Sequence, residues 1–163
     1  MKRWLSLVVG TVCFTIIVLI ALPLTCNQRG FPKSACLSNM KQSMLAAMIY
    51  AEENESHLPP ATTWMDNLAK FIPAGREGVL GCPFVPDFSL DSASTFGYAM
   101  NRFVDGARLT NFSNPGEIPV LFETGILERN ANDFMTSHGM HNRHEGQTTV
   151  GFADGHVKSL ATR

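Results

Sequence analysis

Four histidines near the C-terminus are the residues best suited to chemistry. His138, His141 and His144 are spaced by three residues, and His156 follows closely. Spacing by three places side chains on one face of a helix, and imidazole is a common zinc ligand. The intervening glycine and asparagine disfavour a helix, and no zinc motif such as His-Glu-x-x-His is present. Two interpretations follow: a metal- or ligand-binding module built from these histidines, or polar loop histidines of which one packs. The sequence favours the second.

Carboxylates and amides provide candidate ligands for a second kind of metal, calcium, which prefers oxygen. They gather in the segments Asp87–Asp91 and Asn130–Asp133, neither of which has EF-hand spacing. Glu123, Asp133 and Glu145 could add carboxylates to the histidines, but no pattern places them together. There is no Gly-x-Ser-x-Gly motif and no glycine-rich phosphate loop. We therefore predict no enzyme and no resident cofactor, with calcium or zinc as the alternatives.

His144 and Asp154 have the residue types of an acid–base pair and are separated by nine residues. In one extended strand, ten steps of about 3.3 Å would place them about 33 Å apart. They can meet only if the chain reverses at residues 145–147. The interpretation that we favour is structural: Asp154 and Gly155 form a hairpin turn, while His144 packs or hydrogen-bonds where the chain enters the hairpin.

The first structural element predicted after the N-terminal segment is an amphipathic helix. Apolar side chains recur at helical spacing from Ser34 to Glu53, which predicts a helix with one buried face. A methionine-rich face of this kind is typical of a protein core. A second, short helix is predicted over Trp64–Ile72. The residues of the buried stripe are Cys36, Met40, Met44, Ala47 and Ala51.

Short strands follow the helices, so the predicted fold class is α+β. We expect strands at Thr95–Met100 and Pro119–Glu123, and a hairpin that pairs 148–153 with 156–160 across Asp154-Gly155. A two-residue turn would place Phe152 opposite Val157. The predicted architecture is an N-terminal transmembrane helix followed by an amphipathic helix packed on a small antiparallel β-sheet.

The N-terminal segment Trp4–Leu24 contains no charged residue. As a helix it would be about 30 Å long, the thickness of a bilayer's hydrocarbon core. Lys2 and Arg3 precede it, which predicts a cytoplasmic N-terminus in a single-pass protein of the cell (inner) membrane, with the lipid bilayer as a partner. The expected domains are an anchor at 1–26, a linker at 27–33 and an extracytoplasmic domain at 34–163. The alternatives are a cleaved signal peptide and lipidation at Cys26.

Two cysteines, Cys36 and Cys82, fall in the expected outer domain. An oxidising compartment permits a disulfide between them, which would close a loop of about 47 residues. The alternative is a pair of buried thiols. Residues after position 29 include 10 Lys/Arg and 14 Asp/Glu, a net charge of −4, and the basic residues are scattered. This balance argues against a nucleic-acid partner.

Several segments form an ordered set along the chain: 35–42, 50–54, 58–60, 82–83, 96–101, 114–123, 143–144 and 152–157. Together they resemble the sequences of bacterial pilin-like proteins and type II secretion pseudopilins. At the C-terminus, His144, Asp154 and Gly155 match the H-x9-DG motif of the prepilin-type processing-associated family. The N-terminal cleavage motif is not matched, since Thr15 stands where that motif has glutamate.

This resemblance implies a pilin-like ectodomain with a structural or assembly role. Its expected setting is a type II secretion or type IV pilus-like system, and its expected partners are other pilin-like subunits or secretion-system components. In this interpretation no residue is catalytic, and the disulfide would join the amphipathic helix to the loop that contains Cys82.

Overall fold

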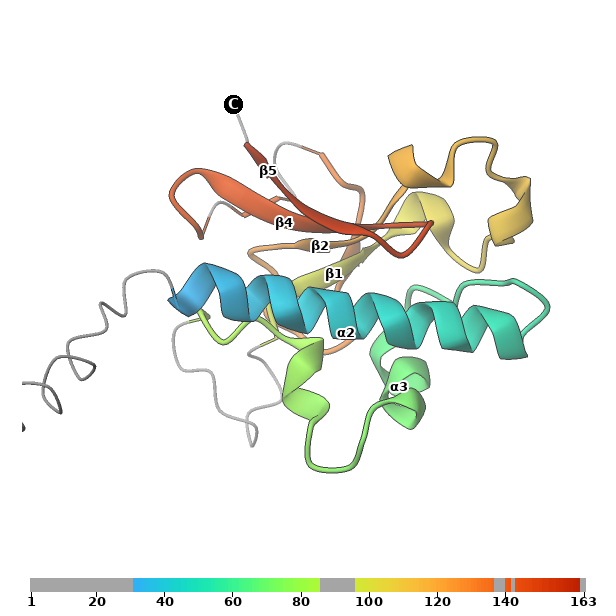
Figure 1. Ribbon diagram of the computed structural model, residues 1–163, viewed down its shortest axis with the longest axis horizontal. Helices are drawn as coiled ribbons and strands as arrows, with labels where there is room; N and C mark the ends of the chain where they lie inside the picture. The colour runs from blue at the N-terminus through green and yellow to red at the C-terminus, as the bar shows by residue number, and fades with distance from the viewer. Residues whose placement is uncertain (1–30, 86–95, 137–139, 142, 162–163) are drawn as a thin grey trace, which may run out of the picture. The chain divides into compact units, whose positions relative to one another are not determined.

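The long helix α2 (Phe31–Glu53) lies along the β-sheet and organises the domain (Figure 1). The computed structural model describes residues 31–85, 96–136, 140–141 and 143–161. All five residues of the predicted apolar stripe are at most 1% exposed, which confirms the buried face of the helix. α2 also includes residues 31–33, which the sequence analysis assigned to the linker.

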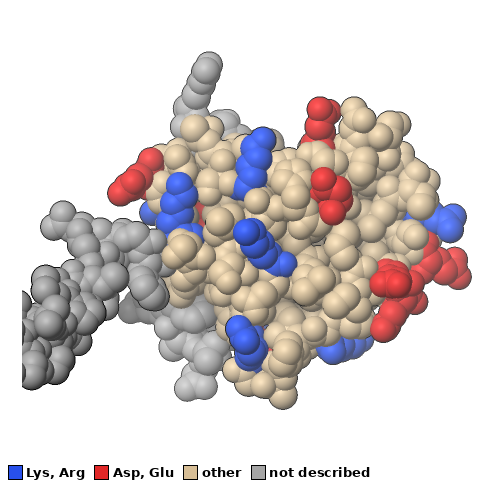
Figure 2. All heavy atoms as spheres, in the orientation of Figure 1, with Lys and Arg blue, Asp and Glu red and all other residues tan. Residues whose placement is uncertain are grey.

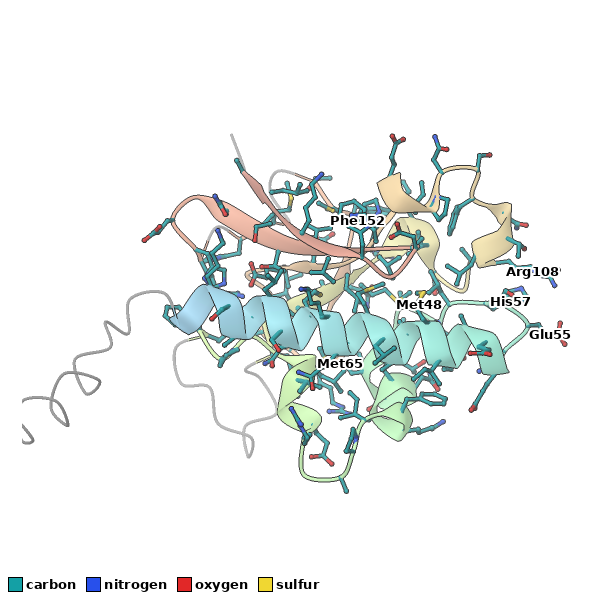
Figure 3. All side chains as sticks on the ribbon, viewed as in Figure 1. Met48, Glu55, His57, Met65, Arg108 and Phe152 are labelled. Atoms are coloured by element: carbon teal, nitrogen blue, oxygen red, sulfur yellow. A yellow bond between two sulfur atoms is a disulfide. The ribbon has the colours of Figure 1, made fainter. Side chains whose placement is uncertain are left out.

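Short helices cover the side of α2 that faces away from β4 and β5 (Figure 1). Figure 3 shows Met65 of α3 on this side, whereas Met48 of α2 lies on the side of Phe152 and the sheet. Met65 has no exposed surface. α2 therefore forms a middle layer. The elements on its outer side are α3 (Trp64–Leu68), η3 (Ala69–Phe71) and η4 (Glu77–Leu80).

The β-sheet has five strands in the order β3-β1-β2-β4-β5. Its pairs are antiparallel except β1 with β3, which is parallel. The predicted purely antiparallel sheet is therefore wrong at this edge. The sequence analysis missed β3 because it has two polar residues and no alternating pattern. The strands are β1 (Tyr98–Asn101), β2 (Pro119–Glu123), β3 (Asn132–Asp133), β4 (Gln147–Phe152) and β5 (Val157–Ala161).

Three single-turn helices connect β1 to β2. They are η5 (Arg102–Val104), η6 (Leu109–Asn111) and η7 (Pro115–Glu117). The bounds of β2 agree with the predicted strand Pro119–Glu123, whose apolar centre is buried.

The β4–β5 hairpin has the predicted turn but not the predicted register. Gly151 lies opposite Val157, whereas a two-residue turn would place Phe152 there. The loop contains three residues, 153–155, and the Gly155 N–H donates a hydrogen bond of 2.8 Å to the Phe152 carbonyl. Gly155 has φ +87°, the left-handed conformation that closes a three-residue loop. The additional loop residue shifts the pairing by one position.

The fold-class prediction of a transmembrane helix is corrected. Within the described part of the chain, no helix is both long enough and apolar enough to cross a membrane. α2 has 23 residues, but it carries lysines in its first half and two glutamates at its end. These charges disfavour insertion of the helix into a bilayer. The segment 1–26, on which the prediction was based, lies outside the described residues.

Charged side chains are unevenly placed on the face shown in Figure 2. Acidic groups gather where α2 ends, and basic groups are scattered between uncharged areas. This face therefore has no continuous basic surface of the kind that binds a polyanion.

Gly151 allows α2 to approach β4 closely. A Cβ at this position would lie 2.3 Å from Met44 Cγ and 2.6 Å from its Sδ. We expect Gly151→Ala to lower the free energy of unfolding by about 1–3 kcal/mol, because a packed core resists an added methyl group. Urea unfolding followed by circular dichroism measures this change.

Gly125→Ala is the matched control, since its Cβ would make an ordinary contact 3.4 Å from His141 Cδ2. We expect its unfolding midpoint to stay close to that of the wild type. A Gly151→Ala midpoint equal to that of Gly125→Ala would contradict the close packing.

Candidate functional site

A disulfide joins α2 to the segment that follows η4. Cys36 and Cys82 are bonded, with their Cα atoms 5.1 Å apart, and neither residue has exposed surface. The Cys82 N–H donates to the Phe96 carbonyl at 2.8 Å, and the Tyr98 hydroxyl donates to the Cys36 carbonyl at 2.9 Å. The pairing is consistent with the disulfide that the sequence favoured.

Beside the disulfide lies a buried carboxylate–imidazole pair. Glu123, the last residue of β2, has no exposed surface, and His144 is 5% exposed. Their side chains meet with Nε2 of His144 2.9 Å from Oε1 of Glu123. The other carboxylate oxygen, Oε2, accepts a hydrogen bond of 2.7 Å from the Thr149 N–H. Both oxygens of the buried carboxylate therefore have partners, which such a group requires.

The two pairs form one group, which we call the buried cluster: Cys36, Cys82, Glu123 and His144. One ligand-type atom from each lies within 4.8 Å of those of the other three. Among the described residues this is the single such group of histidine, cysteine and carboxylate side chains. Its chemistry is that of a disulfide, an imidazole and a carboxylate held away from water. Such a set suits cross-linking or metal coordination better than turnover of a soluble substrate.

A tight reversal of the chain brings His144 to Glu123. Glu145 and Gly146 both have positive φ, +53° and +79°, and the Gln147 N–H returns to the His144 carbonyl at 3.1 Å. Positive φ at two successive residues is the geometry of a type I′ turn. The sequence analysis identified residues 145–147 as the place where the chain would have to reverse, and it reverses there.

Tyr98 and Arg143 lie next to the buried cluster. Burial raises the pKa of the Tyr98 phenol well above its usual value, and the charge of Glu123 raises it further. Burial lowers the pKa of the Arg143 guanidinium, and the Glu123 carboxylate opposes that shift. The guanidinium donates to the Gly97 carbonyl at 3.0 Å and also to the Thr124 carbonyl. Arg143 thus places a half-buried positive charge near Glu123.

The structure does not bring the described members of the predicted histidine set together. His144 is buried in the cluster, whereas His141 is exposed, and burial together with the Arg143 charge lowers its pKa. His156 stacks on the Phe152 ring and pairs with Asp154. His138 lies outside the described residues. Sequence spacing failed here because the described residues of this segment, 140, 141, 143 and 144, are not helical.

His144 and Asp154 have separate partners rather than one another. Asp154 Oδ1 lies 2.6 Å from Nδ1 of His156 and accepts a hydrogen bond of 3.0 Å from the His156 N–H. That backbone hydrogen bond is the main reason why the pKa of Asp154 is lowered. Asp154 and Gly155 belong to the hairpin turn, and His144 hydrogen-bonds where the chain enters β4. This agrees with the structural interpretation of the motif.

Of the two oxygen-rich segments considered for calcium, Asp87–Asp91 lies outside the described residues. In Asn130–Asp133 two side-chain oxygens accept backbone hydrogen bonds. The Asn130 amide oxygen accepts from the Met65 N–H at 2.8 Å, and Asp133 Oδ1 accepts from the Phe134 N–H at 2.7 Å. The first contact joins this loop to α3, and the second lies within the loop itself.

An open depression of about 300 Å³ lies near the buried cluster. The exposed ring of Phe84 forms part of its lining and packs against the His144 ring, with centroids 5.7 Å apart. Phe84 thus lies between this depression and the imidazole. The remaining lining residues are Gly125, Leu127, His141 and Arg143.

Two residues of the site were difficult to recognise from sequence. Glu123 was named as one of three carboxylates, and Arg143 was not singled out as functional. The available signal for Glu123 was a carboxylate directly after the apolar run 120–122, where a buried strand ends. Its contact with His144 depends on the pairing of β2 with β4, which no local pattern reveals.

Comparison of the chain with protein-family models, with curated proteins and with solved structures found no match.

The disulfide closes a long loop, since its cysteines are 46 positions apart in the sequence. We expect reduction, or the double replacement Cys36→Ala/Cys82→Ala, to lower the free energy of unfolding by about 4 kcal/mol, because the loop no longer restricts the unfolded chain. Urea unfolding in the presence of a metal chelator measures the loss. An unchanged midpoint after complete reduction would contradict this role.

Glu123→Ala leaves the Thr149 N–H and the His144 imidazole without their acceptor. We expect it to lower the free energy of unfolding by about 3–5 kcal/mol, the usual cost of breaking a buried pair. Glu123→Gln keeps one acceptor oxygen and should lose less. Glu128→Gln, at an exposed position, is the control in the same urea series. Equal stability of Glu123→Ala and Glu128→Gln would show that the pair does not support the fold.

Proposed function

We propose that residues 31–163 form a pilin-like structural domain of a type II secretion or type IV pilus-like system. The observation that carries this proposal is the burial of the chemically versatile side chains. All four members of the buried cluster are at most 5% exposed, and their ligand-type atoms lie within 4.8 Å of one another. Groups enclosed in this way stabilise a fold and are not presented to a soluble substrate. This arrangement supports a structural role.

The family motif contributes to the hairpin in the same structural sense. His144 links the chain before β4 to Glu123 at the end of β2. Gly155 closes the three-residue loop between β4 and β5, and Asp154 caps that loop through the His156 N–H. A motif that secures a hairpin suits a subunit whose task is to keep its shape.

The disulfide supports a location outside the cytoplasm. Cys36 and Cys82 are bonded to each other, and disulfides persist mainly in oxidising compartments. Secretion and pilus-like subunits work in such a compartment, so the two parts of the proposal agree.

An exposed aromatic pair provides a candidate contact for a neighbouring subunit. Phe103 is 74% exposed and Phe134 is 40% exposed, and their ring centroids lie 4.7 Å apart. The Arg102 guanidinium lies 5.2 Å from the centroid of the Phe134 ring. Aromatic residues and arginine are enriched at the centres of protein interfaces. We place the subunit contact at this pair, beside the β3 edge of the sheet.

Photo-crosslinking from position 103 tests the proposal in cells that make the full-length chain. We expect a photoreactive phenylalanine analogue at this position to form adducts with another pilin-like subunit or secretion-system component. Phe134→Ser should reduce the yield several-fold, because it removes the ring that packs against Phe103.

The same analogue at Lys70, an exposed residue of η3, is the control for random collisions. Adduct yields at 103 no higher than at Lys70, or adducts with unrelated proteins alone, would count against an assembly role.

A further inference from the structure

The buried cluster contains more metal-ligating groups than a structural disulfide requires. Two sulfurs, an imidazole nitrogen and a carboxylate oxygen all lie within 4.8 Å of one another. A disulfide cross-link needs only the two sulfurs. The other two groups are not part of that bond, yet they are buried against it, with His144 Nε2 3.9 Å from Cys82 Sγ.

We propose that reduction of the Cys36–Cys82 disulfide creates a site for one divalent metal ion of the zinc class. Its ligands are the two thiolates, Nε2 of His144 and Oε1 of Glu123. Two sulfurs, one nitrogen and one oxygen form a set suited to zinc, and four protein ligands without an open position are typical of a structural site. This inference does not depend on the proposed assembly role.

The cluster is close to the size that tetrahedral coordination requires. Zinc–ligand distances near 2.0–2.3 Å place neighbouring ligand atoms about 3.3 to 3.8 Å apart. In the oxidised protein, Nε2 of His144 lies 2.9 Å from Glu123 Oε1 and 3.9 Å from Cys82 Sγ. Reduction then has to separate the two sulfurs to about 3.8 Å. The two distances given above need to change by less than about 1 Å, and the remaining ligand pairs start from no more than 4.8 Å.

The surroundings already hold the carboxylate in position. Oε2 of Glu123 is fixed by the Thr149 N–H at 2.7 Å, which leaves Oε1 directed toward His144. Hydrogen bonds of this kind orient metal ligands and strengthen binding. The second oxygen therefore needs no new partner when the first binds a metal.

Charge is also balanced at the proposed site. Two thiolates and one carboxylate around a divalent ion leave one net negative charge. The half-buried guanidinium of Arg143 lies close enough to Glu123 for their charges to interact, and its backbone hydrogen bonds to Gly97 and Thr124 keep it there. A buried anionic complex is thereby offset by a fixed cation.

The redox step needs a reductant, and a dithiol protein or reagent serves this purpose. The dithiol gives two electrons and two protons to the Cys36–Cys82 bond and becomes a disulfide, and both cysteines become thiols. Metal binding then forms two metal–sulfur bonds and releases the two thiol protons to solvent. In the oxidised protein, Nε2 of His144 donates a hydrogen bond to the Glu123 carboxylate. Metal binding therefore requires the neutral imidazole to change tautomer: Nε2 gives its proton to solvent and binds the metal, and Nδ1 takes up a proton from solvent.

The consequence is a cross-link that survives reduction. Cys36 belongs to α2, Cys82 follows η4, Glu123 ends β2 and His144 precedes β4. The disulfide and the hydrogen-bonded pair connect these segments in the oxidised protein. The metal would connect the same four segments in the reduced protein.

Cobalt(II) titration of the full-length chain, kept in mild detergent without oxygen, tests the proposal. The protein is reduced with a phosphine, which takes up the oxygen of water as the disulfide becomes two thiols. We expect one cobalt ion per chain, visible bands of tetrahedral intensity and a thiolate-to-metal charge-transfer band. Added zinc should abolish these bands in a 1:1 ratio, and the oxidised protein should show none of them.

Variants assign the ligands. Cys36→Ser, Cys82→Ser and His144→Gln should each weaken metal binding by about 100-fold or more, since loss of a ligand costs at least as much as loss of a supporting hydrogen bond. His141→Gln, at a nearby exposed histidine, is the matched control and should bind like the wild type. Equal weakening in His141→Gln would overturn the assignment.

The proposal is overturned if the reduced chain binds no stoichiometric metal, or if the oxidised chain binds it equally well. Should the reduced, metal-free chain lose its helical circular dichroism, one equivalent of zinc is expected to restore it, and failure to do so also overturns the proposal. Neither result bears on photo-crosslinking from Phe103, which tests the assembly role separately.

Discussion

Glu123 imposes the strictest requirement in this domain, because an ionisable side chain with no exposed surface must find all its partners inside the protein. One partner is the Thr149 N–H in β4, and the other is the imidazole of His144, which precedes that strand. Both can reach the carboxylate only if the chain reverses at residues 145–146 and β4 then pairs with β2. The hydrogen bonds of the Glu123 carboxylate therefore require both the turn before β4 and the pairing of β2 with β4.

The packing of α2 follows from a second constraint, the short distance between helix and sheet. Met44 occupies the space that a side chain at position 151 would otherwise fill. The disulfide from Cys36 holds the first half of the same helix to the segment after η4. The helix is therefore fixed by close packing at Met44 and by a covalent bond at Cys36.

Interior and surface have different roles in the proposed function. The interior contains the redox-active and ligand-type groups, and their burial explains why they stabilise the fold. The surface presents the aromatic pair Phe103–Phe134 beside a sheet edge, where a neighbouring subunit could bind. A metal that replaces the disulfide would preserve the interior under reducing conditions and leave this surface unchanged.

Local sequence predicted the long helix, β2 and the hairpin, but not β3. The apolar stripe from Cys36 to Ala51 repeats at helical spacing, β2 has an apolar run at 120–122, and Asp154-Gly155 marks the turn of the hairpin. These signals lie within a few residues of one another, so local sequence is enough to reveal them. The α+β class, the buried face of α2 and the turn at Asp154-Gly155 were all predictable for that reason. The predicted transmembrane helix was not supported, and the hairpin register was off by one because Ala153 belongs to the loop and not to the strand.

Which side chains contact one another could not be predicted from the sequence, because these contacts depend on the tertiary fold. Glu123 and His144 are 21 positions apart, and Cys82 is 62 positions from His144. Their contact depends on strand order and on the path of the chain around α2, which spacing along the sequence does not encode. The histidine spacing pointed to His138, His141 and His144 as a set because it assumed a helix. The fold instead buries His144 beside Glu123 and the disulfide, which come from distant segments. In this buried position the Glu123 carboxylate provides the hydrogen-bond partner that water provides for an exposed imidazole.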